Sequence, residues 1–112
     1  MTLVLRRTDS RFVPEWNRDK FWNVYCEGVY LGSIVEGMGR SDEPPHWDWV
    51  VQLHAGRYFN GLAHLSSGRA VTRQEAMAAY RRAWDIIRLA IGDEGWRLHL
   101  EHMEWLDRRD SA

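Results

Sequence analysis

Cysteine, lysine and long apolar runs are scarce in this sequence of 112 residues. The one cysteine, Cys26, has no second cysteine with which to form an internal disulfide, so a reducing compartment suits the chain best. The sequence shows no basic-then-apolar leader, and no apolar run approaches the roughly 20 residues needed to cross a bilayer. We therefore expect a cytoplasmic protein with no membrane span.

An excess of charge of one sign is also lacking, since 15 basic and 16 acidic residues give a formal net charge of −1. Dedicated nucleic-acid binders usually carry a broad positive excess. The basic residues are arginines except for Lys20, and a guanidinium matches phosphate oxygens well, but GC-rich coding explains that bias more simply. The charge balance therefore disfavours nucleic acid as a partner, except through a local basic patch.

The length predicts a single domain spanning residues 1–112, with a core region at residues 21–91 and a helical tail at residues 92–109. Hydrophobic residues make up 45% of the chain, which is enough to build a core in a domain of this size. We expect that neither a disulfide nor a cofactor is needed for stability.

Alternation of apolar and polar residues predicts an antiparallel meander of three to four strands. Residues 21–36 form a hairpin pattern that turns at Glu27 and Gly28, and residues 46–54 resume the alternation. Residues 2–7 suit a short edge strand, while Asn60 and Gly61 interrupt a weaker candidate strand at residues 58–64. Loops are expected over residues 8–20 and 37–45.

A long amphipathic helix is predicted to begin at Arg73, because Thr72 and Glu75 match the capping-box pattern. Gly92 is its natural end, and Asp93 can cap a second, short helix. The sequence thus predicts an α+β fold in which the meander packs against the long helix. Apolar residues follow the first helix at steps of three and four, namely Ala76, Tyr80, Ala83, Trp84, Ile87, Ala90 and Ile91.

Seven tryptophans are many for this length, and exposed aromatic rings on a sheet can stack on bases or sugars. Alternation, however, places Trp22, Trp47 and Trp49 on one sheet face, and helical spacing places Trp84 on the apolar stripe. We interpret these four as one core cluster and Cys26 as a small core residue.

Chemistry-bearing residues form no recognisable motif. His99 and His102 lie three residues apart, which permits shared metal ligation on a helix surface, although solvated surface histidines are the simpler interpretation. The sequence His99-Leu100-Glu101 matches half of a zinc deaminase signature, but the paired cysteines that this chemistry requires do not follow. We therefore assign no catalytic, cofactor-binding or metal-binding residue.

Four segments of the sequence form a distinctive set: Phe21-Trp22-Asn23-Val24, Gly28-Val29-Tyr30-Leu31-Gly32-Ser33-Ile34, Trp47-Asp48-Trp49, and Thr72 to Tyr80 with Trp84. Together they resemble a family of unknown function found in small proteins of rhizobia and related alphaproteobacteria. The similar region runs from Phe21 to Arg88, with Ser33 where the family has an arginine and Gln74 where it has a glutamate. The resemblance implies the same fold and an alphaproteobacterial source, and it implies no activity.

The helical tail supplies a candidate partner interface, because four of its apolar residues share one stripe. Residues 69–91 carry five arginines against Glu75 and Asp85, a net charge of +3, whereas residues 92–112 carry three arginines against six acids, a net charge of −3. This attraction can act within one chain or between two copies. The stripe residues are Trp96, Leu100, Met103 and Leu106.

The leading functional hypothesis is a non-catalytic protein-interaction module whose partner is another protein or a second copy in a homodimer. A nucleic-acid-binding module is the alternative, and a small-ligand binder or enzyme, with a cleft lined by His54, His64 or Asp48, is the third. The nucleic-acid hypothesis uses four arginines on one helix flank, namely Arg73, Arg81, Arg82 and Arg88.

Overall fold

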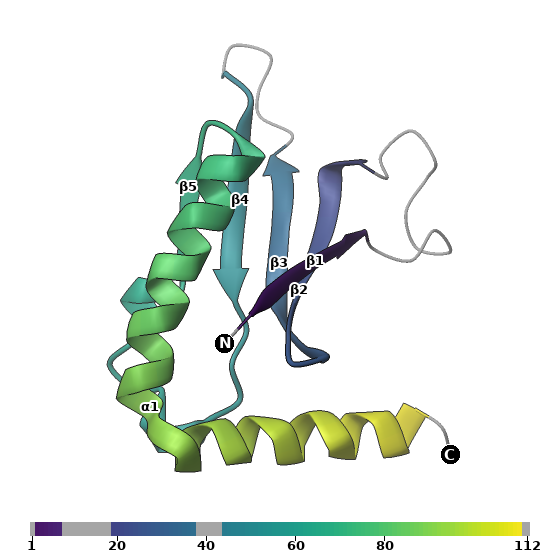
Figure 1. Ribbon diagram of the computed structural model, residues 1–112, viewed down its shortest axis with the longest axis vertical. Coiled ribbons are helices and arrows are strands. Elements are labelled where there is room, and N and C mark those ends of the chain that lie inside the picture. The colour runs from purple at the N-terminus through teal and green to yellow at the C-terminus, as the bar shows by residue number, and fades with distance from the viewer. Residues whose placement is uncertain (1, 8–18, 38–43, 111–112) are drawn as a thin grey trace.

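The computed structural model describes residues 2–7, 19–37 and 44–110. Five strands form one antiparallel sheet in chain order, and a long C-terminal helix, α1 (Arg73–Asp110), crosses it (Figure 1). The α+β class is confirmed, and the sheet has more strands than the three or four predicted. The strands are β1 (Leu3–Arg7), β2 (Phe21–Cys26), β3 (Val29–Gly37), β4 (His46–Val51) and β5 (Ser67–Ala70).

The candidate strand at residues 58–64 does not form. This part of the chain forms the single-turn helices η2 (Gly56–Tyr58) and η3 (Ala63–Leu65), and Gly61 adopts a φ of 85° between them. The missed strand β5 follows instead, and its pairing places Gly68 opposite Trp49. Strand β5 contains no β-branched or aromatic residue, so its pairing with β4 decides its conformation. The loops expected over residues 8–20 and 37–45 lie mostly outside the described residues.

The predicted hairpin is confirmed as β2 and β3. Glu27 and Gly28 have φ values of 52° and 78°, the left-handed pair that a tight hairpin turn requires. The register then shifts, because Tyr25 pairs with Tyr30 while Val24 pairs with Gly32. Leu31 is the extra residue of this bulge, and its side chain is fully buried.

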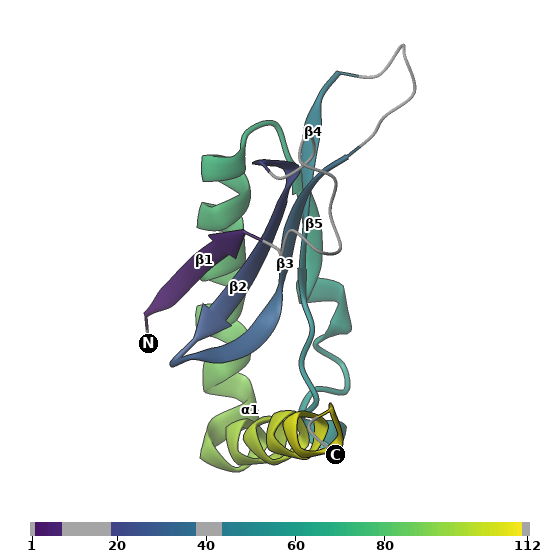
Figure 2. The ribbon, with the colours of Figure 1, turned by 90° about the vertical axis from the view of Figure 1, so that its right-hand side faces the viewer.

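Helix α1 begins at Arg73, as predicted. The Thr72 hydroxyl accepts a hydrogen bond from the Glu75 backbone N–H at 3.1 Å, and the Glu75 carboxylate accepts one from the Val71 N–H at 3.3 Å. At Gly92 the dihedral angles leave the helical range, and residues 93–110 run in a new direction beneath the sheet (Figure 2). We call residues 93–110 the tail helix, and its bounds agree with the helical tail predicted at residues 92–109.

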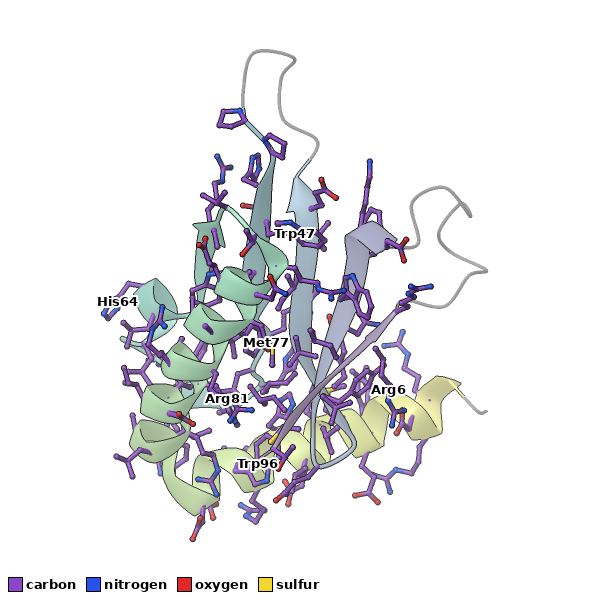
Figure 3. The ribbon with its side chains drawn as sticks, turned by 45° about the horizontal axis from the view of Figure 1, so that its top comes forward. Arg6, Trp47, His64, Met77, Arg81 and Trp96 are labelled. Carbon is purple, nitrogen blue, oxygen red and sulfur yellow. The ribbon has the colours of Figure 1, made fainter. Side chains whose placement is uncertain are left out.

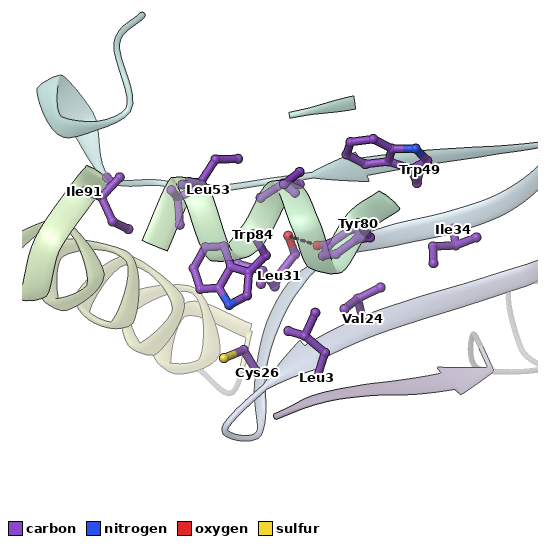
Figure 4. Packing of buried hydrophobic residues seen from close by; sticks show 14 of the residues in the cluster. Leu3, Val24, Cys26, Leu31, Ile34, Trp49, Leu53, Tyr80, Trp84 and Ile91 are labelled. Atoms are coloured by element: carbon purple, nitrogen blue, oxygen red, sulfur yellow. Dashed lines mark hydrogen bonds between the residues drawn. The ribbon is translucent and has the colours of Figure 1, made fainter. Parts of the chain in front are cut away.

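The core fills the space between the sheet and α1 (Figure 4). Tyr80 and Trp84 are fully buried, and the Tyr80 hydroxyl donates a hydrogen bond to the Leu31 carbonyl at 3.0 Å. The core reaches beyond the predicted residues 21–91, because Leu3 and Trp96 are also buried. The apolar packing therefore ties the edge strand and the tail helix to the centre of the molecule.

The predicted aromatic cluster is confirmed for Trp47, Trp49 and Trp84, but Trp22 lies outside the core cluster, with the Arg73 guanidinium over its ring. Trp22 and Trp49 pair with the same residue of β3 from opposite sides, so both side chains lie on the face that α1 covers. Trp49 and Trp84 are buried, whereas Trp22 and Trp47 are half-buried. Cys26 is fully buried beside Trp84, and burial raises the pKa of its thiol.

Helix α1 has 38 residues, yet neither it nor any other helix in the described ranges combines the length and apolar character needed to span a membrane.

Candidate functional site

His99 attaches the tail helix to the sheet. Its side chain is completely buried, its Nδ1 accepts a hydrogen bond from the His54 backbone N–H at 3.1 Å, and its Nε2 lies 2.9 Å from the Tyr30 carbonyl oxygen. Since Nδ1 must accept, the proton resides on Nε2 and the ring is neutral. The expectation of a solvated histidine was therefore wrong for His99, because helical spacing does not reveal which face docks.

Aromatic rings stack outward from His99 along the tail helix. The His54 ring lies 5.9 Å from the His99 ring and 3.9 Å from the His102 ring, measured between centroids. Burial lowers the pKa of His99 and, together with nearby His102, lowers that of His54. Among the described residues, no group of three histidine, cysteine, aspartate or glutamate side chains is placed to hold a metal ion. The hydrogen bonds of His99 to the backbone of His54 and Tyr30 make this cluster a joint between the tail helix and the sheet.

A hollow of about 350 Å³ lies between the β2–β3 hairpin and the tail helix, and we call it the tail groove. Apolar side chains line it together with two tyrosines and two carboxylates, so the groove combines an apolar surface with negative charge. The lining residues are Tyr25, Gly28, Val29, Tyr30, Leu100, Met103, Glu104 and Asp107.

The hairpin wall of the tail groove is held by several side-chain contacts. The rings of Tyr25 and Tyr30 meet edge to face at 6.1 Å, and the Tyr30 hydroxyl donates a hydrogen bond to the Gln52 Oε1 at 2.6 Å. The Arg6 guanidinium lies 5.3 Å from the centre of the Tyr25 ring. Burial raises the pKa of Tyr30, which keeps its hydroxyl neutral and able to donate. These contacts within the chain fix the orientation of both tyrosines.

The four predicted interface residues do not share one surface. Leu100 and Met103 line the tail groove, while Leu106 is half-buried and does not line it. Trp96 is only 6% exposed and packs against Trp84 with ring centroids 5.5 Å apart, at the junction of the two parts of α1 (Figure 3). The assignment of Trp96 to an interface was wrong, because the bend at Gly92 directs its side chain into the core of its own chain.

The four arginines of the nucleic-acid hypothesis do not form one flank either. Arg73 lies 4.3 Å from the centre of the Trp22 ring, and Arg88 forms an ion pair with Asp93 at 2.9 Å. Arg81 and Arg82 are both exposed, but successive helical residues point about 100° apart. Arg82 therefore faces away from the side that the other three share.

The residues named for a catalytic cleft are dispersed. The His54 ring stacks with the rings of His99 and His102 of the tail helix, and His64 is exposed on η3 (Figure 3). Asp48 lies on the sheet face opposite α1, where it forms an ion pair with Arg69 at 3.1 Å and lies 3.4 Å from His46 Nε2. The fold brings no two of the three predicted residues together.

Exposed apolar side chains on α1 were missed by the sequence analysis. Leu89 is 85% exposed and Ile86 is 54% exposed, on the side of the helix turned away from the sheet. A helical projection would have found them, since both fall outside the stripe that contains Tyr80 and Ile87. We call the surface formed by Ala78, Arg82, Ile86 and Leu89 the outer face; Ala90, which the sequence placed in the apolar stripe, is also exposed.

Comparison of the chain with models of protein families, with curated protein sequences and with solved structures finds no match.

Proposed function

We propose that this chain is a small, non-catalytic protein-interaction module that binds a segment of another protein in the tail groove. The supporting observation is that Val29, Leu100 and Met103 line the same hollow as Glu104 and Asp107. An apolar surface excludes water from a bound side chain, while nearby carboxylates select its neighbours by charge.

The chemistry of the groove specifies its occupant. A leucine- or phenylalanine-sized side chain suits a hollow of about 350 Å³, and Met103 can adjust its three rotatable bonds to the shape that enters. Glu104 is exposed on the rim, and residues 92–112 carry a net charge of −3 from three arginines and six acids. The proposed ligand is therefore a peptide segment with one large apolar anchor and a flanking arginine or lysine.

Nucleic acid remains the alternative partner, and Arg81 and Arg82 are the exposed arginines that would contact phosphate. Arg73 and Arg88 are engaged with Trp22 and Asp93, which favours the protein partner. The third hypothesis, a small-ligand binder or enzyme, has weaker support, because His54, His64 and Asp48 lie apart.

We further propose a cytoplasmic location and kinship with the alphaproteobacterial family named above. Burial of the thiol of Cys26, the one cysteine, suits a reducing compartment. Strand β2, the β2–β3 turn and the capped start of α1 coincide with three of the segments that carry the resemblance.

A random-peptide display library provides a direct test of the groove. We expect selected peptides to share a large apolar residue next to arginine or lysine, and to shift the NMR signals of Met103 and Leu100 on binding. Glu104→Lys should weaken binding by roughly tenfold, because it replaces attraction by repulsion at the rim.

Glu101→Lys is the matched control, since it makes the same charge change on the same helix at a residue that pairs with Arg97 and does not line the groove. It should leave peptide affinity within about twofold. The proposal is wrong if no peptide binds more tightly than about 1 mM, or if Glu101→Lys weakens binding as much as Glu104→Lys.

A further inference from the structure

We infer that His99 is a pH-sensitive latch of the tail groove, which holds the tail helix under the β2–β3 hairpin while its ring is neutral and frees that helix when the ring is protonated. The inference rests on the proposed function, because it concerns the regulation of the same groove. Acidic conditions then separate the two walls of the groove and release the bound peptide.

His99 connects the two walls of the tail groove. Its Nε2 lies 2.9 Å from the carbonyl oxygen of Tyr30, a residue of the hairpin wall. Leu100 follows His99 directly, Met103 lies about one helical turn further on, and both belong to the helix wall. The distance between the walls is therefore fixed by a residue that titrates.

His99 is also the main anchor of the far part of the tail helix. Of residues 97–109, His99 alone is buried, whereas Leu100 and Met103 are half-buried and Trp105 is 48% exposed. Trp96, which precedes this segment, packs on Trp84 in the core. Loss of the His99 anchor therefore frees the segment after Trp96 and leaves the packing between the sheet and the first part of α1 in place.

Protonation removes one half of this anchor. The neutral Nδ1 accepts a hydrogen bond from the His54 N–H at 3.1 Å, and a protonated Nδ1 can no longer accept it. The Nε2 proton can still be donated to the Tyr30 carbonyl, but the ring then carries a charge in a buried position. The docked position of the helix is therefore specific to the neutral ring.

The groups around His99 add to the effect of protonation. The two side chains whose charge acts on the ring are His54, from the segment after β4, and His102, from the tail helix itself. From the first part of α1, Arg88 lies over the indole ring that stacks on His99. On β3, the Tyr30 hydroxyl is neutral and bound to Gln52. Each neighbour that is charged in acid is thus a cation and repels a protonated His99.

The direction of the response follows from burial. Burial lowers the pKa of His99 in the docked helix below its ordinary value of 6.5, and release restores exposure to water. The freed form therefore binds a proton first as pH falls, and the ratio of freed to docked helix grows by at most about tenfold per pH unit. By linkage, a peptide that binds only the docked form lowers the pKa of His99 further.

An NMR titration of the free protein from about pH 7.5 to about pH 5 tests the latch without any peptide. The ring ¹⁵N signals of His99 should show a proton on Nε2 at neutral pH and a second proton on Nδ1 in acid. As Nδ1 is protonated, the Met103 methyl signal should shift. Hydrogen exchange of the His54 amide should become at least about tenfold faster relative to the Val51 amide, which donates within the sheet region to the Ser66 carbonyl.

The peptide experiment uses the tightest-binding arginine-containing peptide that the library yields at about pH 7.5, since arginine keeps its charge throughout the titration. Its dissociation constant should rise roughly fivefold or more by about pH 5, because the binding-competent fraction falls. Saturation with the peptide should move the titration midpoint of His99 to lower pH.

His99→Gln separates the latch from other acid effects, because an amide can accept and donate hydrogen bonds but does not titrate. This variant should bind the peptide at about pH 7.5 within roughly threefold of the wild type and lose most of the pH dependence. His102→Gln keeps both hydrogen bonds of His99 and removes a neighbouring charge, so the midpoint of release should move to higher pH. His64→Gln, at an exposed histidine, should behave as the wild type does.

Three results would overturn the inference. The first is a Met103 signal and a His54 amide that are unaltered at about pH 5, and the second is an equal loss of protection at Val51, which would mean that the whole molecule unfolds. The third is full pH dependence of peptide binding in His99→Gln. Failure of every peptide to bind at about pH 7.5 contradicts the groove itself, whereas the titration of the free protein still shows whether His99 holds the tail helix.

Discussion

At the scale of single residues, His99 shows how a titratable group becomes structural. Both ring nitrogens are used by backbone atoms of other elements, the His54 N–H and the Tyr30 carbonyl. Protonation of His99 Nδ1 would place a second N–H against the His54 backbone N–H, and the hydrogen bond between them would be lost. Burial is the largest cause of the lowered pKa of His99; the hydrogen bond to Tyr30 opposes it, and the neighbouring His54 and His102 lower the pKa further.

Stability should therefore fall as the medium becomes acidic. The folded-state pKa of His99 lies below its ordinary value of 6.5, so the unfolded chain binds a proton first as pH drops. The contribution is fully present above pH 6.5 and is lost as pH falls toward the folded-state pKa, at a slope of at most about 1.4 kcal/mol per pH unit for one histidine. Urea unfolding between about pH 7.5 and pH 5.5 measures this slope.

The variant His99→Leu should unfold more easily by about 2 kcal/mol at neutral pH, because two partly buried backbone groups lose their hydrogen-bond partner. Its dependence on pH should also be shallower than that of the wild type. His64→Gln removes an exposed histidine and should change neither quantity. An unaltered slope in His99→Leu would show that other groups cause the pH dependence.

The two tryptophans Trp84 and Trp105 lie on the same helix in opposite environments, 1% and 48% exposed. Trp84→Ala removes a ring from a filled core and should lower the free energy of unfolding by about 3–5 kcal/mol. Trp105→Ala should cost less than about 1 kcal/mol. Equal losses in chemical denaturation would contradict the packing of α1 against the sheet.

At the scale of secondary-structure elements, Gly92 decides where the tail helix goes. Its φ of 67° and ψ of −175° lie in a region that is open essentially to glycine alone. The resulting bend carries Trp96 and His99 into the core, where they meet Trp84 and the backbone of β3. The tail groove exists because this bend brings the tail helix under the β2–β3 hairpin.

Gly92→Ala should destabilise the protein by about 1–3 kcal/mol and favour a straight helix, which would draw His99 out of its site. Hydrogen exchange of the His54 amide, which donates to His99, should then become fast relative to that of the Val51 amide in β4. Gly61→Ala is the matched control, because Gly61 also has a positive φ of 85° and a methyl group added there would meet no atom within 4 Å. It should leave the ratio of the two exchange rates unchanged.

At the scale of the whole molecule, one chain offers two surfaces with different chemistry. The tail groove has acidic residues around apolar ones, whereas the outer face has the exposed side chains of Ile86 and Leu89 beside Arg82. The opposite net charges of residues 69–91 and 92–112 are partly used within the chain, in the ion pair between Arg88 and Asp93.

Local patterns in the sequence determined the β2–β3 hairpin, the start of α1 at Arg73 and the end of its first part at Gly92. Each of these rests on interactions within a few residues, such as the Thr72 cap and the left-handed pair Glu27 and Gly28, so the sequence contains the whole cause. The stripe with Tyr80 and Trp84 was also evident from the sequence, because helical periodicity fixes which residues share a face.

Only the tertiary structure decided that residues 67–70 form strand β5 and that Trp96 and His99 are buried. Strand β5 depends on pairing with β4, and Trp96 and His99 depend on the direction that the chain takes after Gly92. The tail groove likewise joins residues of β2 and β3 to residues far later in the chain, as the contact between Tyr30 and His99 across 69 positions illustrates. Such long-range contacts depend on the packed arrangement of all elements, and no local pattern records them.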